Sequence, residues 1–396
     1  MAEIETHKRP LQGVPDKTAG QITLRGMTWD HSRGFDPMAA TAKAFAKAHP
    51  NVSIIWEKRS LQAFADRPIQ DMARDYDLMV IDHPHVGEVA KTGVLHALDS
   101  KNRAAALADL ARQSVGPSHA SYNIDGRQWA LAIDAATPVA CYRPDLLQSP
   151  PSRWEDVIKL AQQGKVAFAL KPINALMTFL GMARNLGADI AVSAERLLDT
   201  ATGTQVLEAL CEVAALMDKR CLHMDPIGIF EWMGRQDAAP AYAPFGYGYT
   251  NYSRDGYCQY PLVFADAPGF GDNGPRGTVI GGTGIAVSAQ SQHKDIAEDY
   301  AFWIAGAACQ SGLFFEVGGQ PANAVAWESD ACNRASRDFF RNTRATLESS
   351  WVRPRYDGYM GFQAAGGDII HACLSGQATI AHTLAKLEDA YQRSRT

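Results

Sequence analysis

One carboxylate and two imidazoles, Asp82, His83 and His85, directly follow the short apolar run of residues 78–81. An apolar run of this length is typical of a buried strand, and Pro84 prevents the strand from continuing. Because open α/β sheets bind ligands beyond the carboxyl ends of their strands, we expect these three side chains to face a ligand. The carboxylate would accept hydrogen bonds from hydroxyl or ammonium groups, and the imidazoles would donate or accept them.

Two other interpretations of the same residues stay open. In an extended backbone His83 and His85 would lie on one face, where Asp82 or His31 could complete a site for zinc, manganese or iron. Alternatively, one histidine caps the following helix and the others are solvated. Since the sequence contains no HExxH-type motif, we predict ligand contacts and expect neither a metal nor a cofactor.

Aromatic residues elsewhere could contribute to the same cleft. Trp29 follows the first predicted strand, so its ring could stack on a sugar or a cation, or simply pack inside the fold. Tyr247 and Tyr249 belong to a tyrosine-rich segment and could hydrogen-bond a ligand or pack between domains. Asp134, between two predicted strands, could face the cleft or form a turn.

Two further segments complete the predicted site. Glycines at 281–284 would let the backbone approach a ligand or bend the strand. Arg353, in an unusual segment of two arginines and two aromatic residues, could bind an acidic ligand, although an ion pair between the domains is slightly favoured. The predicted ligand-binding residues are Trp29, His31, Arg33, Asp82, His83, His85, Asp134, Tyr247, Tyr249, Gly282, Thr283, Arg353 and Tyr356. No catalytic residue is predicted.

The elements that must position these residues suggest two domains, because 396 residues exceed what one core usually supports. Strands and helices alternate through the first third of the chain, which predicts a parallel sheet with right-handed crossovers. Asp36 and Pro37 are predicted to cap and open the first helix. The expected strands are 21–26, 52–57, 78–81, 129–133, 139–142 and 278–288. The expected helices are 36–48, 69–74, 86–92, 154–163, 174–187, 193–199, 203–218, 226–234 and most of the tail from residue 296.

Composition narrows the class of protein. With 46% hydrophobic and 20% charged residues and a net charge of −5, the chain is an ordinary soluble globular protein without a basic block, so no nucleic-acid partner is expected. No apolar run is long enough to cross a bilayer. Residues 1–20 read as a polar lead-in without the apolar stretch of a secretory signal, which implies a cytoplasmic protein if Met1 is the native start. The seven scattered cysteines contain no CxxC pair and are expected to be free thiols.

Four segments, in order, carry a family resemblance. They are Gly93-Val-Leu-His-Ala-Leu-Asp99 at the end of 76–99, Cys141-Tyr-Arg-Pro-Asp145 within 126–146, Pro150-Pro-Ser-Arg-Trp-Glu-Asp-Val157, and Ile280-Gly-Gly-Thr-Gly-Ile-Ala-Val287 followed by 297–304. Over roughly residues 20–390 the chain resembles the extracellular solute-binding proteins of ABC transporters, in the sugar-binding group related to maltodextrin-binding proteins.

The resemblance implies an α/β, two-lobed, periplasmic-binding-protein-like fold with a hinge and a central ligand cleft. The expected N-terminal lobe comprises 21–135 and about 265–320, and the helix-rich C-terminal lobe comprises 136–264 and about 321–396. The implied function is capture of a small polar solute, a carbohydrate or a derivative, in a periplasmic protein that passes it to a membrane permease. The alternative is an intracellular lyase or hydrolase on the same scaffold, possibly metal-dependent, that uses Asp82, His83 and His85.

Overall fold

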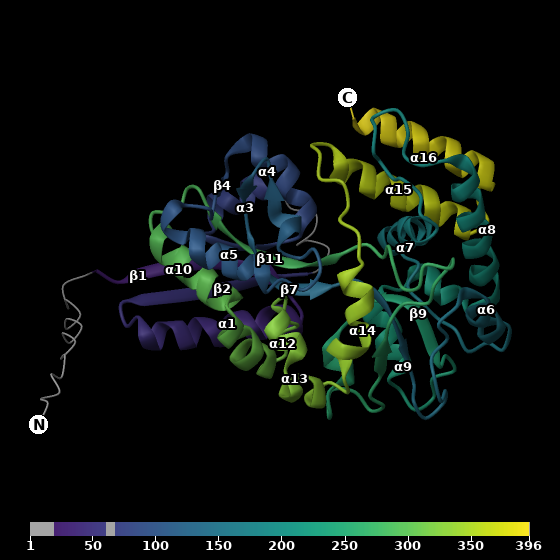
Figure 1. Ribbon diagram of the computed structural model, residues 1–396, viewed down its shortest axis with the longest axis horizontal. Coiled ribbons are helices and arrows are strands. Elements are labelled where there is room, and N and C mark those ends of the chain that lie inside the picture. Colours follow the sequence, from purple (N-terminus) through teal and green to yellow (C-terminus); the bar gives the residue numbers. More distant parts are fainter. Residues whose placement is uncertain (1–19, 61–67, 396) are drawn as a thin grey trace, which may run out of the picture.

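The computed structural model describes residues 20–60 and 68–395, so the predicted lead-in of residues 1–20 lies outside the described residues except for Gly20. Figure 1 shows two lobes side by side, with the purple and blue N-terminal elements in one and the yellow C-terminal helices in the other. This is the two-lobed α/β fold that the sequence predicted.

The N-lobe contains a mixed sheet in the order β2-β1-β3-β11-β4, with β7 paired to β11. Its first three strands are parallel, as the alternating pattern predicted, and β3 consists of four residues that are each at most 1% exposed. The sequence did not predict that β11, from much later in the chain, lies antiparallel beside β3 with Ala286 opposite Met79. The strands are β1 (Ile22–Trp29), β2 (Val52–Arg59), β3 (Leu78–Ile81), β4 (Leu95–His96), β7 (Leu131–Ala136) and β11 (Gly281–Ser288), with a separate pair β5 (Asn123–Ile124) and β6 (Arg127–Gln128).

Helices pack along both sides of this sheet, as Figure 1 shows. They are α1 (Ser32–Ala48), α3 (Ile69–Asp75), α4 (Val86–Thr92), α5 (Ala104–Arg112), α10 (Lys294–Ala305) and α11 (Ala307–Cys309). Short 3₁₀ segments are η1 (His83–His85), η2 (Lys101–Arg103) and η3 (Ala120–Tyr122), and η6 (Gln310–Phe314) is a π-helical turn.

The C-lobe combines a small antiparallel sheet, β10-β8-β9, with a thick helical layer. Its strands are β8 (Pro138–Tyr142), β9 (Tyr242–Tyr247) and β10 (Val263–Ala265). Its helices are α6 (Trp154–Gln162), α7 (Pro172–Asn185), α8 (Thr200–Leu216), α9 (Pro226–Met233), α12 (Ala324–Glu328), α13 (Asp330–Ala335), α14 (Phe339–Glu348), α15 (Tyr359–Leu374) and α16 (Ile380–Ser394), with 3₁₀ segments η4 (Lys219–His223) and η5 (Thr250–Ser253).

Each lobe has its own hydrophobic core. The chain leaves the first core between Ile133 and Ala135, returns to it between Val279 and Ile285, and leaves it again after Phe314. Asp134 therefore sits at a crossing, between Ile133 of one core and Ala135 of the other. Several connections between lobes are the arrangement that hinge closure requires.

Two sequence predictions of helices were wrong. The first helix begins at Ser32 rather than 36, because the His31 imidazole caps it by accepting a hydrogen bond from the Arg33 amide, and Pro37 lies inside the helix. Residues 193–199 are not helical, because the Glu388 carboxylate of α16 binds the Leu197 amide and holds the segment in turns.

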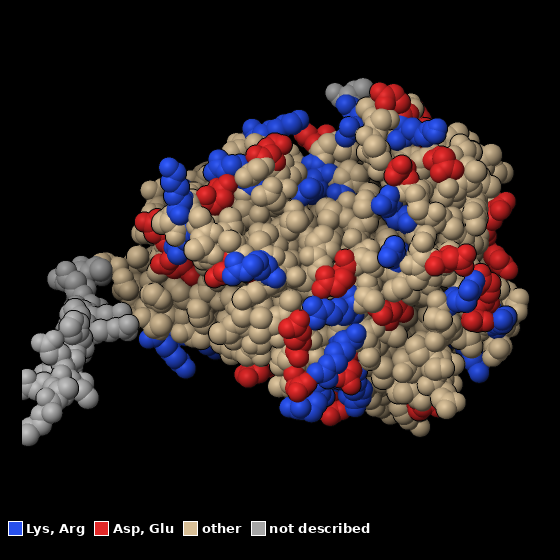
Figure 2. All heavy atoms as spheres, in the orientation of Figure 1, with Lys and Arg blue, Asp and Glu red and all other residues tan. Residues whose placement is uncertain are grey.

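Charges of both signs alternate over the face drawn in Figure 2. The densest mixture lies over α12 to α14, where Arg341 pairs with Asp330 and Asp338, and Arg344 pairs with Glu328 and Glu348. In the part of the chain that the structure describes, no helix combines the length and the apolar character needed to span a bilayer.

The glycine-interrupted strand predicted near 278–288 is present, and its irregularity has a steric cause. The pairing of β11 with β7 shifts between Thr283 and Gly284. Gly282 has a φ of +89°, and a Cβ atom there would lie 2.2 Å from the Asp134 carbonyl oxygen. Only glycine fits this close approach of two strands.

Replacing Gly282 by alanine should therefore lower the free energy of unfolding by roughly 3 kcal/mol or more, since strain and a backbone clash add together. The matched control is Gly93→Ala, because Gly93 has a φ of +63° but nothing within 4 Å of the added atom. This control should cost only about 1–2 kcal/mol. Urea unfolding of both variants measures the difference, and equal losses would contradict the steric explanation.

Candidate functional site

A buried ion pair lies where the chain crosses between the lobes. The Arg33 guanidinium donates to both carboxylate oxygens of Asp134, at 2.7 and 2.5 Å, and to the Gly248 carbonyl at 2.7 Å. Both charged side chains are at most 4% exposed, and the guanidinium carbon lies 4.3 Å from the centre of the Tyr249 ring. Asp134 is therefore a strand residue whose carboxylate binds an arginine, so the turn that the sequence left open as an alternative is not formed.

A second ion pair joins the lobes directly. Asp82 caps η1 by accepting from the His83 amide at 2.8 Å, and its two oxygens accept from Arg353 Nη2 at 3.0 and 2.9 Å. The other terminal nitrogen of Arg353 donates to Gln363 Oε1 on α15 at 2.7 Å. The ion pair between lobes that the sequence favoured for Arg353 is confirmed. Burial would raise the pKa of Asp82, but the charge of Arg353 and the hydrogen bonds from Arg353 and His83 outweigh it and hold this pKa well below its usual range.

The segment after Arg353 makes further contacts between the two lobes. Arg355 donates to the carbonyls of Ser121 and Asn123 in the N-lobe, at 2.7 and 2.9 Å. Its own carbonyl oxygen lies so near Gly87 that an added Cβ atom would be 1.4 Å away. The N-lobe and the C-lobe are thus in close contact along one edge of the seam between them.

The two histidines after β3 are buried and neutral near pH 7. Burial and the Arg353 charge lower the pKa of His83 to about 4, and burial also lowers the pKa of His85. The Nδ1 atom of His83 lies 3.1 Å from the Asp82 carboxylate. Its Nε2 atom is buried and has no hydrogen-bond partner among the described residues.

The predicted binding residues at the end of β1 and in the loop after it are more buried than the sequence suggested. Trp29 is 5% exposed, and its ring covers Gly34, where a Cβ atom would lie 2.3 Å from it. His31 meets the Tyr249 ring edge-on at 5.1 Å and lies 3.4 Å from the Tyr257 hydroxyl. Burial first and Arg33 second lower its pKa to about 4.

Tyrosines surround the ion pair of Asp82. Tyr247 packs on Gly281, where a Cβ atom would lie 2.6 Å from its ring. Burial raises the pKa of Tyr247 and of Tyr359, and both also respond to the charges of Arg353 and Asp82. The Tyr359 hydroxyl and the Thr283 hydroxyl are buried without hydrogen-bond partners in residues 20–60 and 68–395.

Tyr122 connects the two ion pairs. Burial raises its pKa well above the usual value, and the nearby charges of both Asp82 and Asp134 contribute to the shift. Its hydroxyl donates to the Ile81 carbonyl at 3.0 Å, and its ring covers Gly284. The two ion pairs, Arg33 with Asp134 and Asp82 with Arg353, thus form one polar cluster with Tyr122 and the neighbouring tyrosines. Tyr356 is turned away from it, with its hydroxyl 2.6 Å from Ser394 Oγ on α16.

Sequence reasoning missed Tyr122, Tyr257, Tyr359 and Gln363 as members of this cluster. The five tyrosines within 247–260 were a usable signal for Tyr257, but nothing local marked the other three residues. In the described ranges there is no group of three or more His, Cys, Asp or Glu side chains arranged to hold a metal ion.

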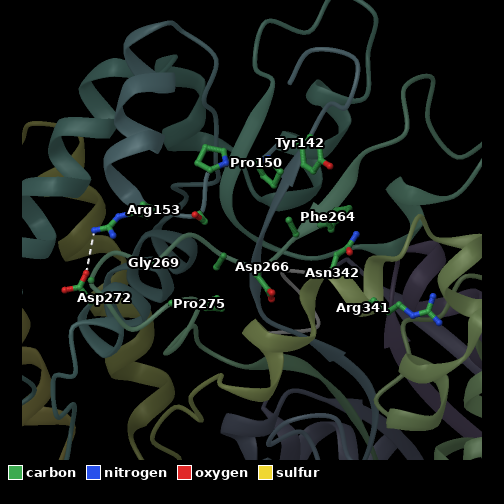
Figure 3. A pocket seen from close by; sticks show the side chains of 16 residues that line it. Tyr142, Pro150, Arg153, Phe264, Asp266, Gly269, Asp272, Pro275, Arg341 and Asn342 are labelled. Atoms are coloured by element: carbon green, nitrogen blue, oxygen red, sulfur yellow. Dashed lines mark ion pairs between the residues drawn. The ribbon is translucent and has the colours of Figure 1, made fainter. Parts of the chain in front are cut away.

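A cavity of about 860 Å³ lies apart from this cluster, on the C-lobe (Figure 3). Tyr142, Phe264 and Asp266 line it together with the loop around Gly269, and Arg153 pairs with Asp272 at its rim at 3.6 Å. None of the predicted ligand-binding residues lines this cavity.

The buried His83 should make stability depend on pH. Its pKa is about 4 in the folded protein but about 6.5 in an unfolded chain. As the pH falls from 6.5 to 4, the unfolded state takes up a proton that the folded state does not, so His83 should remove up to about 3 kcal/mol of stability. His83→Asn should therefore lose less stability than the wild type over this range, whereas His382→Asn, at an exposed position on α16, should follow the wild type. Urea unfolding at stepped pH values tests this, and parallel curves for all three proteins would contradict it.

The comparisons with known proteins agree with this geometry. The family model described as bacterial extracellular solute-binding protein matches residues 29–310, and no curated protein matches the chain. Maltose-bound MalE3 of T. maritima is similar in structure, with a TM-score of 0.80, 13% identity, and coverage of 94% of this chain and 99% of that one. A solute-binding protein of Agrobacterium radiobacter K84 in complex with ribitol has a TM-score of 0.78, 18% identity, and coverage of 95% and 98%. One from Thermotoga lettingae bound with α-D-tagatose has a TM-score of 0.80, 13% identity, and coverage of 95% and 100%. The chain belongs to the family of bacterial extracellular solute-binding proteins.

Proposed function

We propose that this protein binds a small, uncharged carbohydrate or polyol between its lobes and delivers it to the permease of an ABC transporter. The ion pair of Asp82 in the N-lobe with Arg353 in the C-lobe carries the proposal, because buried polar atoms without partners lie close to it. A ligand with several hydroxyl groups can satisfy groups of both lobes at once. Such a ligand binds the closed form more tightly than the open form and so favours closure.

Charge balance supports an uncharged ligand. Each buried arginine of the cluster already has a carboxylate partner, Arg33 with Asp134 and Arg353 with Asp82. An anionic ligand would have to displace one of these carboxylates, and a cationic ligand would have to displace an arginine, each at a large desolvation cost. Hydroxyl groups can leave both ion pairs intact. They can donate hydrogen bonds to the exposed part of the Asp82 carboxylate, because this side chain is 32% exposed.

The structural neighbours support the same ligand class. Maltose, ribitol and α-D-tagatose, named in the three neighbouring structures, are uncharged polyhydroxy compounds. These proteins are less than 25% identical to this chain, so the inference about the ligand rests on the cluster as well as on the likeness.

The enzyme alternative at Asp82, His83 and His85 has no comparable support. Arg353 binds both oxygens of the Asp82 carboxylate, which makes this group a poor base. His85 is 6% exposed, and the family is one of solute-binding proteins.

A thermal-unfolding screen tests the proposed ligand class. Maltose, tagatose and ribitol represent uncharged compounds, and gluconate and glucosamine represent charged ones. A ligand present at 100 times its dissociation constant should add about 2.7 kcal/mol to stability, which raises the melting temperature by several degrees. We expect stabilisation by at least one uncharged member. Stabilisation by the charged members alone would overturn the proposal.

The role of Asp82 can be separated from general effects on closure. Asp82→Asn keeps the shape of the side chain but weakens a charge-assisted hydrogen bond to the ligand, so the affinity should fall by about tenfold to a hundredfold. The control is Asp357→Asn, because Asp357 also pairs across the lobes, with Lys91 at 3.4 Å, but in an exposed position. Its loss should change the affinity by less than about threefold. Calorimetric titration of both variants with the sugar found in the screen measures this, and equal effects would contradict a role for Asp82 in ligand binding.

A further inference from the structure

Two cysteines from distant parts of the chain meet in the helical layer of the C-lobe. Cys211 lies on α8 and Cys373 near the end of α15, and their sulfur atoms are 3.8 Å apart. Figure 1 shows α8, α15 and α16 packed together at the outer side of this lobe. Neither cysteine contacts the ion pairs of the polar cluster in the hydrogen bonds described above.

We propose that Cys211 and Cys373 are a site of reversible oxidation, at which a disulfide forms between α8 and α15 when the protein meets a disulfide oxidant. The proposal is independent of the ligand and of the transporter.

The geometry permits this bond without rebuilding the fold. A disulfide requires a sulfur–sulfur distance of about 2.05 Å, so the two sulfurs must approach each other by roughly 1.8 Å. Side-chain rotation and a small shift of the helices can supply such a movement. Other cysteines face different groups: the Cys141 sulfur lies 3.9 Å from Met233 Sδ, and the Cys332 sulfur lies 3.5 Å from the Ser311 carbonyl.

The two thiols differ in solvent exposure and in pKa. Cys211 is partly exposed, whereas Cys373 is only 4% exposed. Their contact lowers the pKa of Cys373 and raises that of Cys211, because one proton shared between the two sulfurs favours a thiolate at Cys373. An external reagent reaches the more exposed sulfur of Cys211 first, and the Cys373 sulfur lies close enough to complete the bond.

The reaction balances with a small-molecule or protein disulfide as the oxidant. Cys211 loses its proton and attacks one sulfur of the donor, which releases the first donor thiolate and leaves a mixed disulfide on Cys211. The Cys373 thiolate then attacks the Cys211 sulfur and expels the second donor thiolate. Two protein thiols are oxidised to one disulfide, the donor disulfide is reduced to two thiols, and the two protons pass from the protein thiols to the donor thiolates or to solvent.

The bond would restrain the helix that carries two residues of the polar cluster. Helix α15 carries Tyr359 and Gln363, and Gln363 accepts the hydrogen bond from Arg353. Because the closed loop is long, cross-linking should restrict the unfolded chain strongly and raise thermal stability.

Peptide mapping of the full-length protein tests the site. The protein is incubated with oxidised glutathione, its remaining thiols are alkylated, and the digest is analysed by mass spectrometry. We expect a Cys211–Cys373 cross-linked peptide, together with a rise in melting temperature of roughly 5 °C or more that dithiothreitol reverses. Cys373→Ser should abolish the shift and leave a glutathione adduct on Cys211, whereas Cys258→Ser, a partly exposed control, should keep both the cross-link and the shift.

Either of two results on the unmodified protein would overturn the proposal. One is full alkylation of both cysteines after prolonged oxidation. The other is a stable glutathione adduct on Cys211 beside an alkylated Cys373, because it would show that the second sulfur cannot reach the first. Neither result depends on whether a variant folds.

Discussion

The pairing of Arg33 with Asp134 is the constraint on which the arrangement of the lobes depends. Both charges are buried at the point where the chain passes from one core to the other, so neither can lose its partner without being left unsolvated. The same arginine binds the Gly248 carbonyl of the C-lobe. The positive φ of Gly282 and the irregular pairing of β11 lie directly beside Asp134. The ion pair thus connects α1 to the lobe crossing, next to the irregular part of β11.

The ion pair of Asp82 with Arg353 has a different character. Arg353 is buried, but the Asp82 side chain is 32% exposed, so one edge of this link faces solvent. It joins η1 of the N-lobe to α15 of the C-lobe through Gln363. An ion pair that is buried on one side and exposed on the other can hold the lobes together and still contact a ligand. The Arg33–Asp134 pair is buried on all sides, so its role is structural.

Sequence patterns predicted what is decided locally. The apolar run of β3 and the helix at Val86–Thr92 were found with their observed bounds, since an abrupt polar boundary and a proline mark the junction between them. The start of α1 was missed because a histidine acts as its cap, and histidine is not among the preferred capping residues. The partners of Arg33 and Arg353 lie 101 and 271 residues away in the chain, and no local pattern reports such pairs. For the same reason Tyr359 and Gln363 could not be placed near Arg353.

The position of β11 has a consequence for how the protein is made. Strand β3 pairs with β1 on one side and with β11 on the other, yet β11 is synthesised about two hundred residues after β3. While the ribosome translates the C-lobe, the nascent N-lobe sheet ends in an apolar strand with one open edge. Such an edge invites mispairing and aggregation. The first lobe cannot complete its sheet until the chain as far as Ser288 is available, so its folding must wait for most of the second lobe.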